Sequence, residues 1–401
     1  MNNAKQPTLK LSKLVLDGFK SFAPSTGENE GTVVEFGDTT ILLGANGAGK
    51  SNIIQVFALL NQGLSGSLAT YFQQHDSQSF FFMGPRRTPT CRIALEFSND
   101  DGTTDKYTVH FFHGLGNRGR GQVHVAGEEV GYSRPNDPSG HPYHNTLAAS
   151  GACELGLKEQ GRYSPKSRGK RSRPRVEHII YSILASVRAY QFHDTSGWSP
   201  LRLAASVDNS RRLTSDGGNL PAFLLSMSQS PDGERHFRLI ERQIQRVLPE
   251  FGGFDLAGDA SSGRVALNWK SRANPEYVFG PHQLSDGSLR FIALATLLLQ
   301  PAATAPRVIV IDEPELGLHP VALSELAGMV KKAARHSQVV LSTQSPQLID
   351  EFSAKEIRVV EMNPDSGASQ IRALSESALS EWLKEYSPSE LWEKNLIGGR
   401  P

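Results

Sequence analysis

The segment from residue 40 to residue 60 constrains the fold of this chain more than any other feature. The apolar run Thr40–Leu43 predicts a strand, and a helix is predicted from about Lys50 to Leu60. The residues 44–51 between them read Gly-Ala-Asn-Gly-Ala-Gly-Lys-Ser, which is the spacing G-x-x-x-x-G-K-S/T. Glycines let backbone amides surround phosphate groups, and the start of a helix adds partial positive charge. The sequence therefore predicts a phosphate-binding loop within an α/β fold.

The residues of this loop have distinct expected roles. The Lys50 ammonium should reach the β- and γ-phosphates of a nucleotide, and the Ser51 hydroxyl should bind Mg²⁺. We predict nucleotide contacts from Gly44, Ala45, Asn46, Gly47, Ala48, Gly49, Lys50, Ser51 and Asn52. The alternative is a chance glycine-rich turn, but a strand before the loop and a helix after it favour phosphate binding.

A second apolar run, Val308–Ile311, ends in the two carboxylates Asp312 and Glu313. A buried parallel strand would deliver both to the carboxyl edge of the sheet, where ligands bind in open α/β folds. Asp312 is expected to hold Mg²⁺ directly or through water, and Glu313 to orient the attacking water or accept its proton. A strand that merely ends in polar residues is the alternative, and the phosphate loop upstream weighs against it.

Two polar motifs lie on either side of the acidic run. The first consists of Leu284, Ser285, Asp286, Gly287 and Ser288, directly before a predicted helix. The Ser285 hydroxyl and the Gly287 backbone amide can bind a phosphate at the helix start, although Ser-Asp-Gly is also an ordinary way to begin a helix. The second motif is Ser342-Thr343-Gln344-Ser345, which ends the next predicted strand.

In this order, the motifs resemble those of the ABC-class ATPases of the SMC, RecF and OLD group, often labelled AAA ATPases. The resemblance is good over residues 9–60 and 280–361 and loose over residues 62–280. It implies a P-loop NTPase head with a mostly parallel sheet and an antiparallel β subdomain. SMC-type relatives have a long coiled coil between the two parts of the head, whereas this chain is expected to have a globular insertion of helices and loops. In that family two heads enclose ATP, so residues 284–288 are expected to contact the partner's nucleotide in a symmetric homodimer.

The resemblance also implies Mg²⁺-dependent hydrolysis of ATP, with Glu313, Lys50 and Gln344 as catalytic residues. Many relatives carry His where Gln344 stands. A glutamine can still hydrogen-bond a γ-phosphate or a water, but it cannot become cationic. The segment Glu315–Pro320 matches one that lines the dimer seam in that family.

Several further polar residues have two open interpretations. Lys20 is expected either near the phosphates or on the surface. His193 and Asp194 are either a catalytic pair or part of a turn, and the turn is favoured because adjacent strand residues point to opposite faces. The candidates for the family's glutamine that links the two lobes are Gln73, Gln74 and Gln191.

Periodicity and composition predict three regions. Residues 1–61 hold the first part of the head, 62–281 the antiparallel region with the basic loop and helical insertion, and 282–401 the second part of the head. Outside the motifs, strands are expected at Leu9–Leu16, Val33–Phe36, Arg92–Phe97, Tyr107–Phe112 and Val187–Phe192, and helices at Asn219–Ser228 and Glu234–Leu248. The last region alternates helices and strands: Ser288–Leu299, Val308–Asp312, Pro320–Ala334, Val339–Ser342, Pro346–Phe352 and Ile357–Glu361. Residues 117–175 are expected to form long loops.

The near-neutral net charge of +1 conceals a local excess. Residues Lys158–Arg175 carry eight basic side chains and one acidic one, which leaves 34 basic against 40 acidic residues elsewhere. This composition excludes a uniformly basic coat protein but not nucleic acid as a partner of one basic arm. A solvated loop, or an arm for an acidic partner, is the alternative.

These observations predict a protein that hydrolyses ATP, dimerises around it and works as a switch. It would act on DNA or RNA, or on a separately encoded nuclease or toxin, as in phage defence or repair. The alternatives are the ATPase subunit of a membrane transporter and an ATP-binding scaffold that does not turn over. A fused nuclease domain is not expected, because only 40 residues follow Glu361. No secretory signal or membrane span is visible, and the two cysteines, Cys91 and Cys153, lie far apart, so a cytoplasmic protein is expected.

Overall fold

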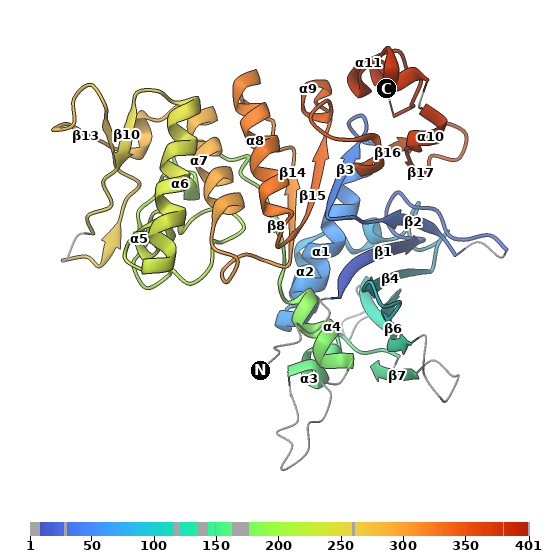
Figure 1. Ribbon diagram of the computed structural model, residues 1–401. Helices are drawn as coiled ribbons and strands as arrows, with labels where there is room; N and C mark the ends of the chain where they lie inside the picture. Colours follow the sequence, from blue (N-terminus) through green and yellow to red (C-terminus); the bar gives the residue numbers. More distant parts are fainter. Residues whose placement is uncertain are drawn as a thin grey trace.

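The computed structural model describes residues 9–27, 30–115, 121–134, 143–148, 150–162, 176–258, 261–379 and 381–399. Two six-stranded sheets dominate it, one mostly parallel and one antiparallel (Figure 1). Within the described residues, no helix is both long and apolar enough to cross a membrane.

The mostly parallel sheet has the strand order β17-β16-β3-β15-β14-β8. Its members are β8 (Val187–Tyr190), β14 (Val308–Asp312), β15 (Gln338–Thr343), β3 (Thr39–Leu43), β16 (Ile357–Met362) and β17 (Ser369–Ala373). All neighbours are parallel except β16 and β17, which pair antiparallel at one edge. β3, β14 and β15 are buried along their whole length, as continuous apolar runs predict for a sheet covered on both faces. β8 belongs to this sheet although it lies inside the insertion expected at residues 62–281.

The antiparallel sheet has the order β2-β1-β4-β5-β6-β7. Its strands are β1 (Lys10–Asp17), β2 (Thr32–Glu35), β4 (Thr90–Ser98), β5 (Thr104–Leu115), β6 (Gly121–Ser133) and β7 (Tyr143–Ala148). The strands expected at Arg92–Phe97 and Tyr107–Phe112 are confirmed as parts of β4 and β5, which pair with each other antiparallel. The expectation of loops throughout residues 117–175 is wrong, because this stretch contains β6, β7 and the helix α3 (Leu157–Arg162).

The reason for this error lies in the pattern of β6. Val123, Val125 and Val130 are buried, but the alternation between them is interrupted by a bulge opposite His110 and Phe111. Bulges shift the side-chain period, and glycines within the strand weaken the local signal further. Pairing with β5 along the strand therefore stabilises a segment whose own sequence reads as a loop.

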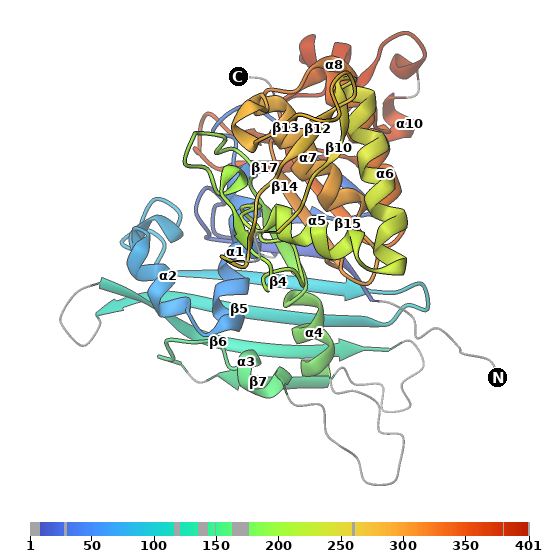
Figure 2. The same cartoon turned by 90° about the vertical axis from the view of Figure 1, so that its left-hand side faces the viewer.

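Alternate residues of the parallel sheet face two different cores. One face, which includes Leu42, Val308 and Val340, packs with the helix α1 (Lys50–Ser65) and the inner face of the antiparallel sheet. The other face, which includes Ile41 and Ile309, packs with helices of the second lobe. Figure 2 shows the antiparallel sheet as a separate layer, with α2 (Leu68–Gln74), α3 and α4 (Val176–Leu184) on it.

The second lobe is helical with two small sheets. Its helices are α5 (Leu220–Ser228), α6 (Pro231–Val247), α7 (Asp286–Leu299) and α8 (Pro320–Ala333). Its short strands are β9 (Ala205–Ser206) with β11 (Arg264–Val265), and β10 (Phe251–Phe254) with β12 (Trp269–Ser271) and β13 (Val278–Phe279). The helix expected at Glu234–Leu248 is confirmed as α6. Its Ile240 and Ile244 are buried, and Phe237, Val247 and Leu248 are partly buried against the same core.

Short elements complete the chain. They are the helices α9 (Pro346–Ile349), α10 (Glu376–Leu379) and α11 (Pro388–Glu393), and the 3-10 turns η1 (Ser77–Phe80), η2 (Pro200–Arg202), η3 (Pro281–Gln283), η4 (Ala354–Glu356) and η5 (Trp382–Lys384). The C-terminal segment returns to the parallel sheet, where the Gly399 carbonyl accepts a hydrogen bond of 2.9 Å from the Ala45 amide.

Candidate functional site

The phosphate loop joins β3 to α1, as predicted, and close neighbours fix its glycines. A Cβ atom at Gly44 would lie 2.1 Å from the Val360 carbonyl oxygen on β16. At Gly49, which caps α1, φ is 112° and a Cβ would lie 2.3 Å from the Ser369 hydroxyl. The neighbouring strands therefore exclude a side chain at both positions, and at Gly49 the positive φ also requires glycine.

A network of hydroxyl groups supports the loop from the side. The Ser369 Oγ donates to the Ala48 carbonyl over 2.6 Å and lies 2.7 Å from the Ser21 Oγ. The side-chain amide of Asn52 donates to the same Ser21 hydroxyl over 2.8 Å. Asn52 thus ties α1 to the segment that follows β1, a contact that the loop spacing does not predict.

Lys50 is folded over the loop and is almost completely buried. Its ammonium donates to the carbonyls of Gly44 and Ala45 over 2.6 and 2.9 Å. Burial lowers the pKa of Lys50 below its usual value, and the nearby carboxylates of Glu313, Asp312 and Glu315 oppose this shift. The cation of the loop therefore shares one electrostatic environment with the acidic end of β14.

The two predicted carboxylates lie at the carboxyl end of β14, which is between β15 and the edge strand β8. Asp312 is buried and accepts a hydrogen bond from the Ser342 hydroxyl on the neighbouring strand. Glu313 leaves the strand with a positive φ of 43°, and its amide donates to the Ser342 carbonyl over 3.0 Å. The turn directs Glu313 toward Gln344, whose Nε2 donates to the Glu313 Oε1 over 3.4 Å. Predicted residues from two strands thus meet at this edge.

Glu315 has a supporting role that sequence reasoning did not assign. Its Oε1 accepts hydrogen bonds from the Thr343 hydroxyl, over 2.6 Å, and from the Gln344 amide, over 3.1 Å. Burial raises the pKa of Glu315. The carboxyl group fixes the backbone of Gln344 and so helps to place its side chain beside Glu313. The available signal was the second glutamate in Asp312-Glu313-Pro314-Glu315.

Residues Leu284–Ser288, which the sequence predicts to contact the partner's nucleotide and which we call the signature motif, lie at the start of α7. Ser285 is the N-cap, and its Oγ accepts from the Ser288 amide over 3.1 Å and donates to the Ser288 Oγ over 2.8 Å. Ser285 and Asp286 are exposed, whereas Leu284 is buried. Gly287 is required by packing, because a Cβ there would lie 2.4 Å from the Gly317 carbonyl. The motif is therefore an ordinary helix start that also leaves its first polar residues open to a partner.

A protein-family model described as "AAA domain, putative AbiEii toxin, Type IV TA system" matches residues 39–350, well over half of the chain. The chain belongs to this family. No protein with a curated description matches the sequence.

Solved structures show the fold of this AAA-domain protein. One is the crystal structure of an Smc head bound to the C-winged helix domain of ScpA, with a TM-score of 0.56, 17% identity, and coverage of 92% of this chain and 99% of that chain. Another is an Smc head domain with an extended coiled coil, bound to the C-terminal domain of ScpA derived from Pyrococcus furiosus. Its TM-score is 0.54 at 16% identity, covering 94% of this chain and 99% of that chain. The predicted P-loop head of the SMC-like group is thereby confirmed as a fold.

Two buried arginines of this AAA-domain protein hold the signature motif in place. Arg290 on α7 donates to the carbonyls of Phe192 and His193, over 2.9 and 3.1 Å, and also to that of Leu316. It thereby connects α7 to the chain beyond β8 and to the chain beyond Glu313. Burial of the guanidinium away from water lowers the pKa of Arg290. Its place in the run Leu289-Arg290 gave no sign of these contacts.

Arg202 acts on the other side of the same motif. Its guanidinium donates to the carbonyls of Pro281 and Leu284, over 2.6 and 3.2 Å, and to the Asp286 carboxylate over 2.7 Å. A further bond of 2.8 Å goes to the Thr195 carbonyl. No motif singled out Arg202, because its partners around the signature motif lie about 80 residues away in the sequence.

The structure places the remaining candidate residues as follows. The His193 ring nitrogen Nε2 lies 2.9 Å from the Asp312 carbonyl oxygen. Asp194 accepts from the Ser196 amide over 3.0 Å, which is the local turn that was favoured over a catalytic pair. The Lys20 ammonium lies 4.8 Å from the centre of the Phe80 ring, and burial lowers its pKa. Lys20 therefore packs on an aromatic ring.

The three candidate glutamines lie in two different places. Gln73 and Gln74 are exposed at the end of α2, which packs on the antiparallel sheet. Gln191 directly follows β8, the strand that pairs in parallel with β14. Of the basic tract Lys158–Arg175, residues 163–175 lie outside the described residues, and residues 158–162 belong to α3.

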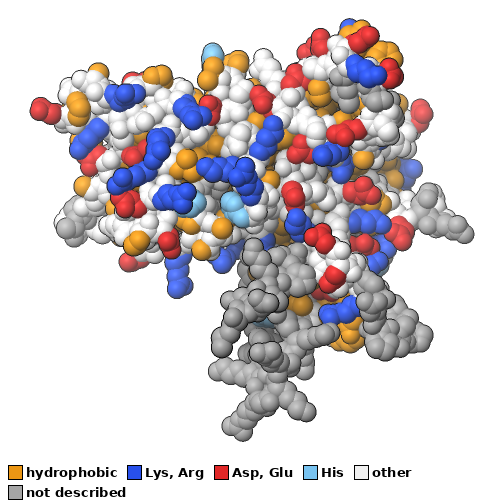
Figure 3. Space-filling model, in the orientation of Figure 1, with side chains coloured by type: hydrophobic (Ala, Val, Ile, Leu, Met, Phe, Trp, Pro, Cys, Tyr) orange, Lys and Arg blue, Asp and Glu red, His pale blue; other side chains and the backbone are white. Residues whose placement is uncertain are grey.

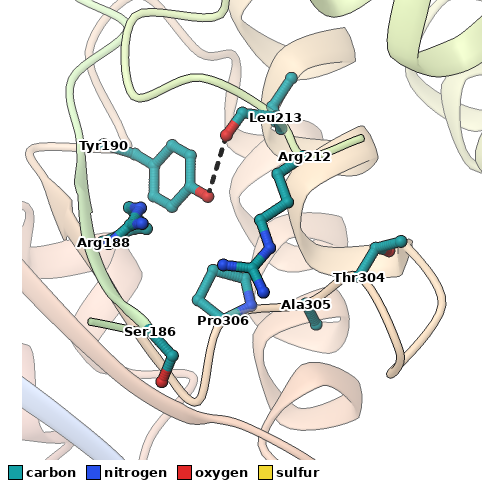
Figure 4. Close-up of a pocket in the computed structure, with 8 residues that line it drawn as sticks. All are labelled: Ser186, Arg188, Tyr190, Arg212, Leu213, Thr304, Ala305 and Pro306. Atoms are coloured by element: carbon teal, nitrogen blue, oxygen red, sulfur yellow. Dashed lines mark hydrogen bonds between the residues drawn. The ribbon is translucent and has the colours of Figure 1, made fainter. Parts of the chain in front are cut away.

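The hollow drawn in Figure 4 lies away from this site. Its lining residues are Ser186, Arg188, Tyr190, Arg212, Leu213, Thr304, Ala305 and Pro306. Ser186 and Pro306 precede β8 and β14, so the hollow opens near the amino edge of the parallel sheet, whereas the phosphate loop lies at the carboxyl edge. None of the predicted nucleotide-binding residues lines it.

Proposed function

We propose that this AAA-domain protein binds ATP with Mg²⁺ between two copies of itself, hydrolyses it, and works as a switch. The observation that carries the proposal is the meeting of the phosphate loop with the acidic strand end. Three separate parts of the chain supply Lys50, the pair Asp312 and Glu313, and Gln344. The two carboxylates favour the charged form of Lys50 and so raise its pKa against the effect of burial. A glycine-rich turn without a function would need none of these partners.

The residues present fit Mg²⁺ and ATP. Ser51, exposed at the start of α1, and Asp312 supply a hydroxyl and a carboxylate, the oxygen donors that Mg²⁺ prefers beside phosphate oxygens. Bound there, the metal would neutralise charge on the β- and γ-phosphates. Residues Gly44–Asn52 would bind the phosphates through backbone amides and the Lys50 ammonium.

Hydrolysis would be carried out by Glu313 and Gln344. Glu313 would accept the proton of the attacking water, since it is the carboxylate that leaves the strand end while Asp312 stays bound to Ser342. The Gln344 amide would orient the same water or the γ-phosphate. We assign the lobe-linking glutamine to Gln191, because β8 carries it to the edge beside β14.

The exposed polar start of α7 supports a dimer. Leu284–Ser288 would contact the nucleotide held by the partner, and binding across two surfaces would make closure depend on ATP. The Smc heads of similar fold are bound to a domain of ScpA, so a separately encoded partner, a nuclease or toxin effector, is proposed for this chain too. Antiviral defence or DNA repair in the cytoplasm would be the setting.

The test compares the unchanged protein with Glu313→Gln, which keeps the shape of the side chain but removes the base. We expect phosphate release from the unchanged protein, its loss in the variant, and a stable ATP-dependent dimer of the variant on a sizing column. If neither protein releases phosphate while both bind ATP, the chain is a scaffold. If neither binds ATP, the whole proposal is wrong.

A further inference from the structure

One helix of the second lobe carries a regular row of arginines. Arg235, Arg238, Arg242 and Arg246 of α6 are all exposed, at spacings of three, four and four residues. This spacing keeps them on one side of a helix, over a length of about 16 Å at 1.5 Å per residue. The opposite side of α6 carries the buried Ile240 and Ile244. The arginines therefore form a row along the outer surface.

The end of α8 extends this row into a surface. The helices α6 and α8 pack against each other. The Gln243 side chain and Arg246 contact Glu325 of α8. We define the basic face by its exposed members, Arg235, Arg238, Arg242, Arg246, Lys331, Lys332 and Arg335. Figure 3 shows blue side chains gathered over α6 and α8.

Little of this charge is neutralised. Arg238 forms an ion pair with Glu234 and Arg246 one with Glu325, both on the surface. Lys331 lies over the Phe352 ring at 5.5 Å. Among the described residues, none of the other members of the basic face has an ion-pair partner. Because exposed ion pairs contribute little and are readily exchanged, all seven cations are open to a polyanion.

We propose that the basic face binds the sugar–phosphate backbone of a nucleic-acid duplex. Arginine forms paired hydrogen bonds with phosphate, and a row of cations suits a row of phosphates. A protein partner would need an apolar centre on this surface. Among the described residues, no large apolar side chain is exposed on α6, and on α8 a single one is exposed, Val321 in the first turn.

The same surface is poorly suited to single strands. Binding of unpaired bases depends on aromatic side chains for stacking. On α6 the aromatic residue is Phe237, which packs against the core and against Phe254. The basic face thus offers contacts to phosphates but not to bases, and binding should be strong in low salt and independent of sequence.

This inference goes beyond the proposed function, because it requires no ATP hydrolysis. It also differs from the predicted role of Lys158–Arg175, a different segment of the chain. A structural connection to the ATP site does exist: the His236 ring nitrogen lies 2.7 Å from the Leu299 carbonyl at the end of α7, the helix that begins with the signature motif.

The test uses the double variant Arg235→Gln/Arg242→Gln, which removes the two arginines without ion pairs. Its matched control is Arg86→Gln/Arg87→Gln, where two exposed arginines lie before β4. Binding to labelled 30-base-pair DNA and RNA duplexes and to a single strand is measured by fluorescence anisotropy without nucleotide, from 50 to 200 mM KCl. We expect the α6 variant to bind duplex about tenfold more weakly, with a salt slope lower by about 1.8.

The outcomes separate the alternatives. Duplex affinity equal to that of the control would overturn the inference, as would no duplex binding by the unchanged protein or preference for the single strand. Loss of binding only when Lys166, Arg168, Lys170 and Arg171 are changed to Gln would assign binding to the basic tract and also overturn it. ATP binding and phosphate release, measured in the same preparations, should be unchanged by the α6 variant and report on the proposed function separately.

Discussion

The Gln344 side-chain amide donates to the Glu313 carboxylate over 3.4 Å, although 31 positions separate the two residues. The contact exists because β14 and β15 are parallel neighbours in register, with Asp312 opposite Ser342. The residues that directly follow the two strands, Glu313 and Gln344, therefore lie at the same edge of the sheet. The Glu315 carboxylate also fixes the Gln344 backbone by accepting a hydrogen bond from the Gln344 amide.

We predict that Gln344→Ala lowers kcat for ATP hydrolysis by roughly 10–100-fold while KM changes little. The loop residues would still bind the phosphates, but the donor that orients the water would be lost. Steady-state phosphate release over a range of ATP concentrations checks this. Gln344→His is the comparison, because imidazole can still donate a hydrogen bond. A raised KM with unchanged kcat would place Gln344 in binding instead.

We predict that Arg290→Lys weakens ATP-dependent dimerisation but leaves ATP binding to the single chain intact. A lysine keeps the charge, but it cannot reach the carbonyls of Phe192, His193 and Leu316 together, as the guanidinium does. The signature helix should lose its position, and ATP-dependent dimerisation and phosphate release should fall about tenfold or more. ATP binding to the single chain, measured by calorimetry, should persist.

The matched control for Arg290 is Arg335→Lys on the surface, which should leave both dimerisation and phosphate release unchanged. Calorimetric unfolding distinguishes local displacement from global failure. Loss of hydrogen bonds to buried carbonyls is expected to cost about 1–3 kcal/mol. If Arg290→Lys unfolds the chain or abolishes ATP binding, Arg290 is structural and the coupling we assign to it is incorrect.

We predict that Gly44→Ala damages the phosphate loop. The added Cβ would meet the Val360 carbonyl oxygen at 2.1 Å, so β16 or the loop must move. Overpacking of this kind costs about 1–3 kcal/mol, and the displaced amides should weaken ATP binding by tenfold or more. Gly280→Ala is the control, since no atom lies within 4 Å of a Cβ there. Equal ATP affinity of the two variants would contradict the prediction.

We predict a pH-dependent gain in stability from Asp105→Asn. Asp105 is buried in β5, neither carboxylate oxygen has a hydrogen-bond partner among the described residues, and burial raises its pKa to about 6. Since the folded pKa exceeds the unfolded value of 3.8, the folded chain binds the proton more tightly. The free energy of unfolding of the unchanged protein should therefore fall as pH rises from about 4 to 6 and level off above that.

The asparagine variant carries no such charge. Above pH 6 the free energy of unfolding of the variant should exceed that of the unchanged protein by about 1–3 kcal/mol. This difference should shrink to zero toward pH 4. Urea unfolding between pH 4 and 8 measures this, with the exposed neighbour Asp100→Asn as a control that shows no such trend. A constant difference across the range would mean that Asp105 is not the titrating group.

Local sequence was informative where the structure depends on neighbouring residues. The strand, loop and helix from Thr39 to Ser65 follow from an apolar run, glycine spacing and helix periodicity, and all three are found. The strand that ends at Asp312 was equally clear. β6 was missed because its alternation is broken, and only pairing with β5 makes it a strand. The contacts of Arg202 were missed because no local pattern describes them.

The sequence by itself determined which chemical groups we propose for nucleotide binding and hydrolysis: the amides and ammonium of the loop, the carboxylates after Ile311, and the Gln344 amide. It could do so because glycine spacing and strand ends act over a few residues. The tertiary structure decided which of these groups meet, and it recruited Glu315, Arg202 and Arg290 to hold them. Those contacts depend on strand order and register across many intervening residues, which short-range patterns do not encode.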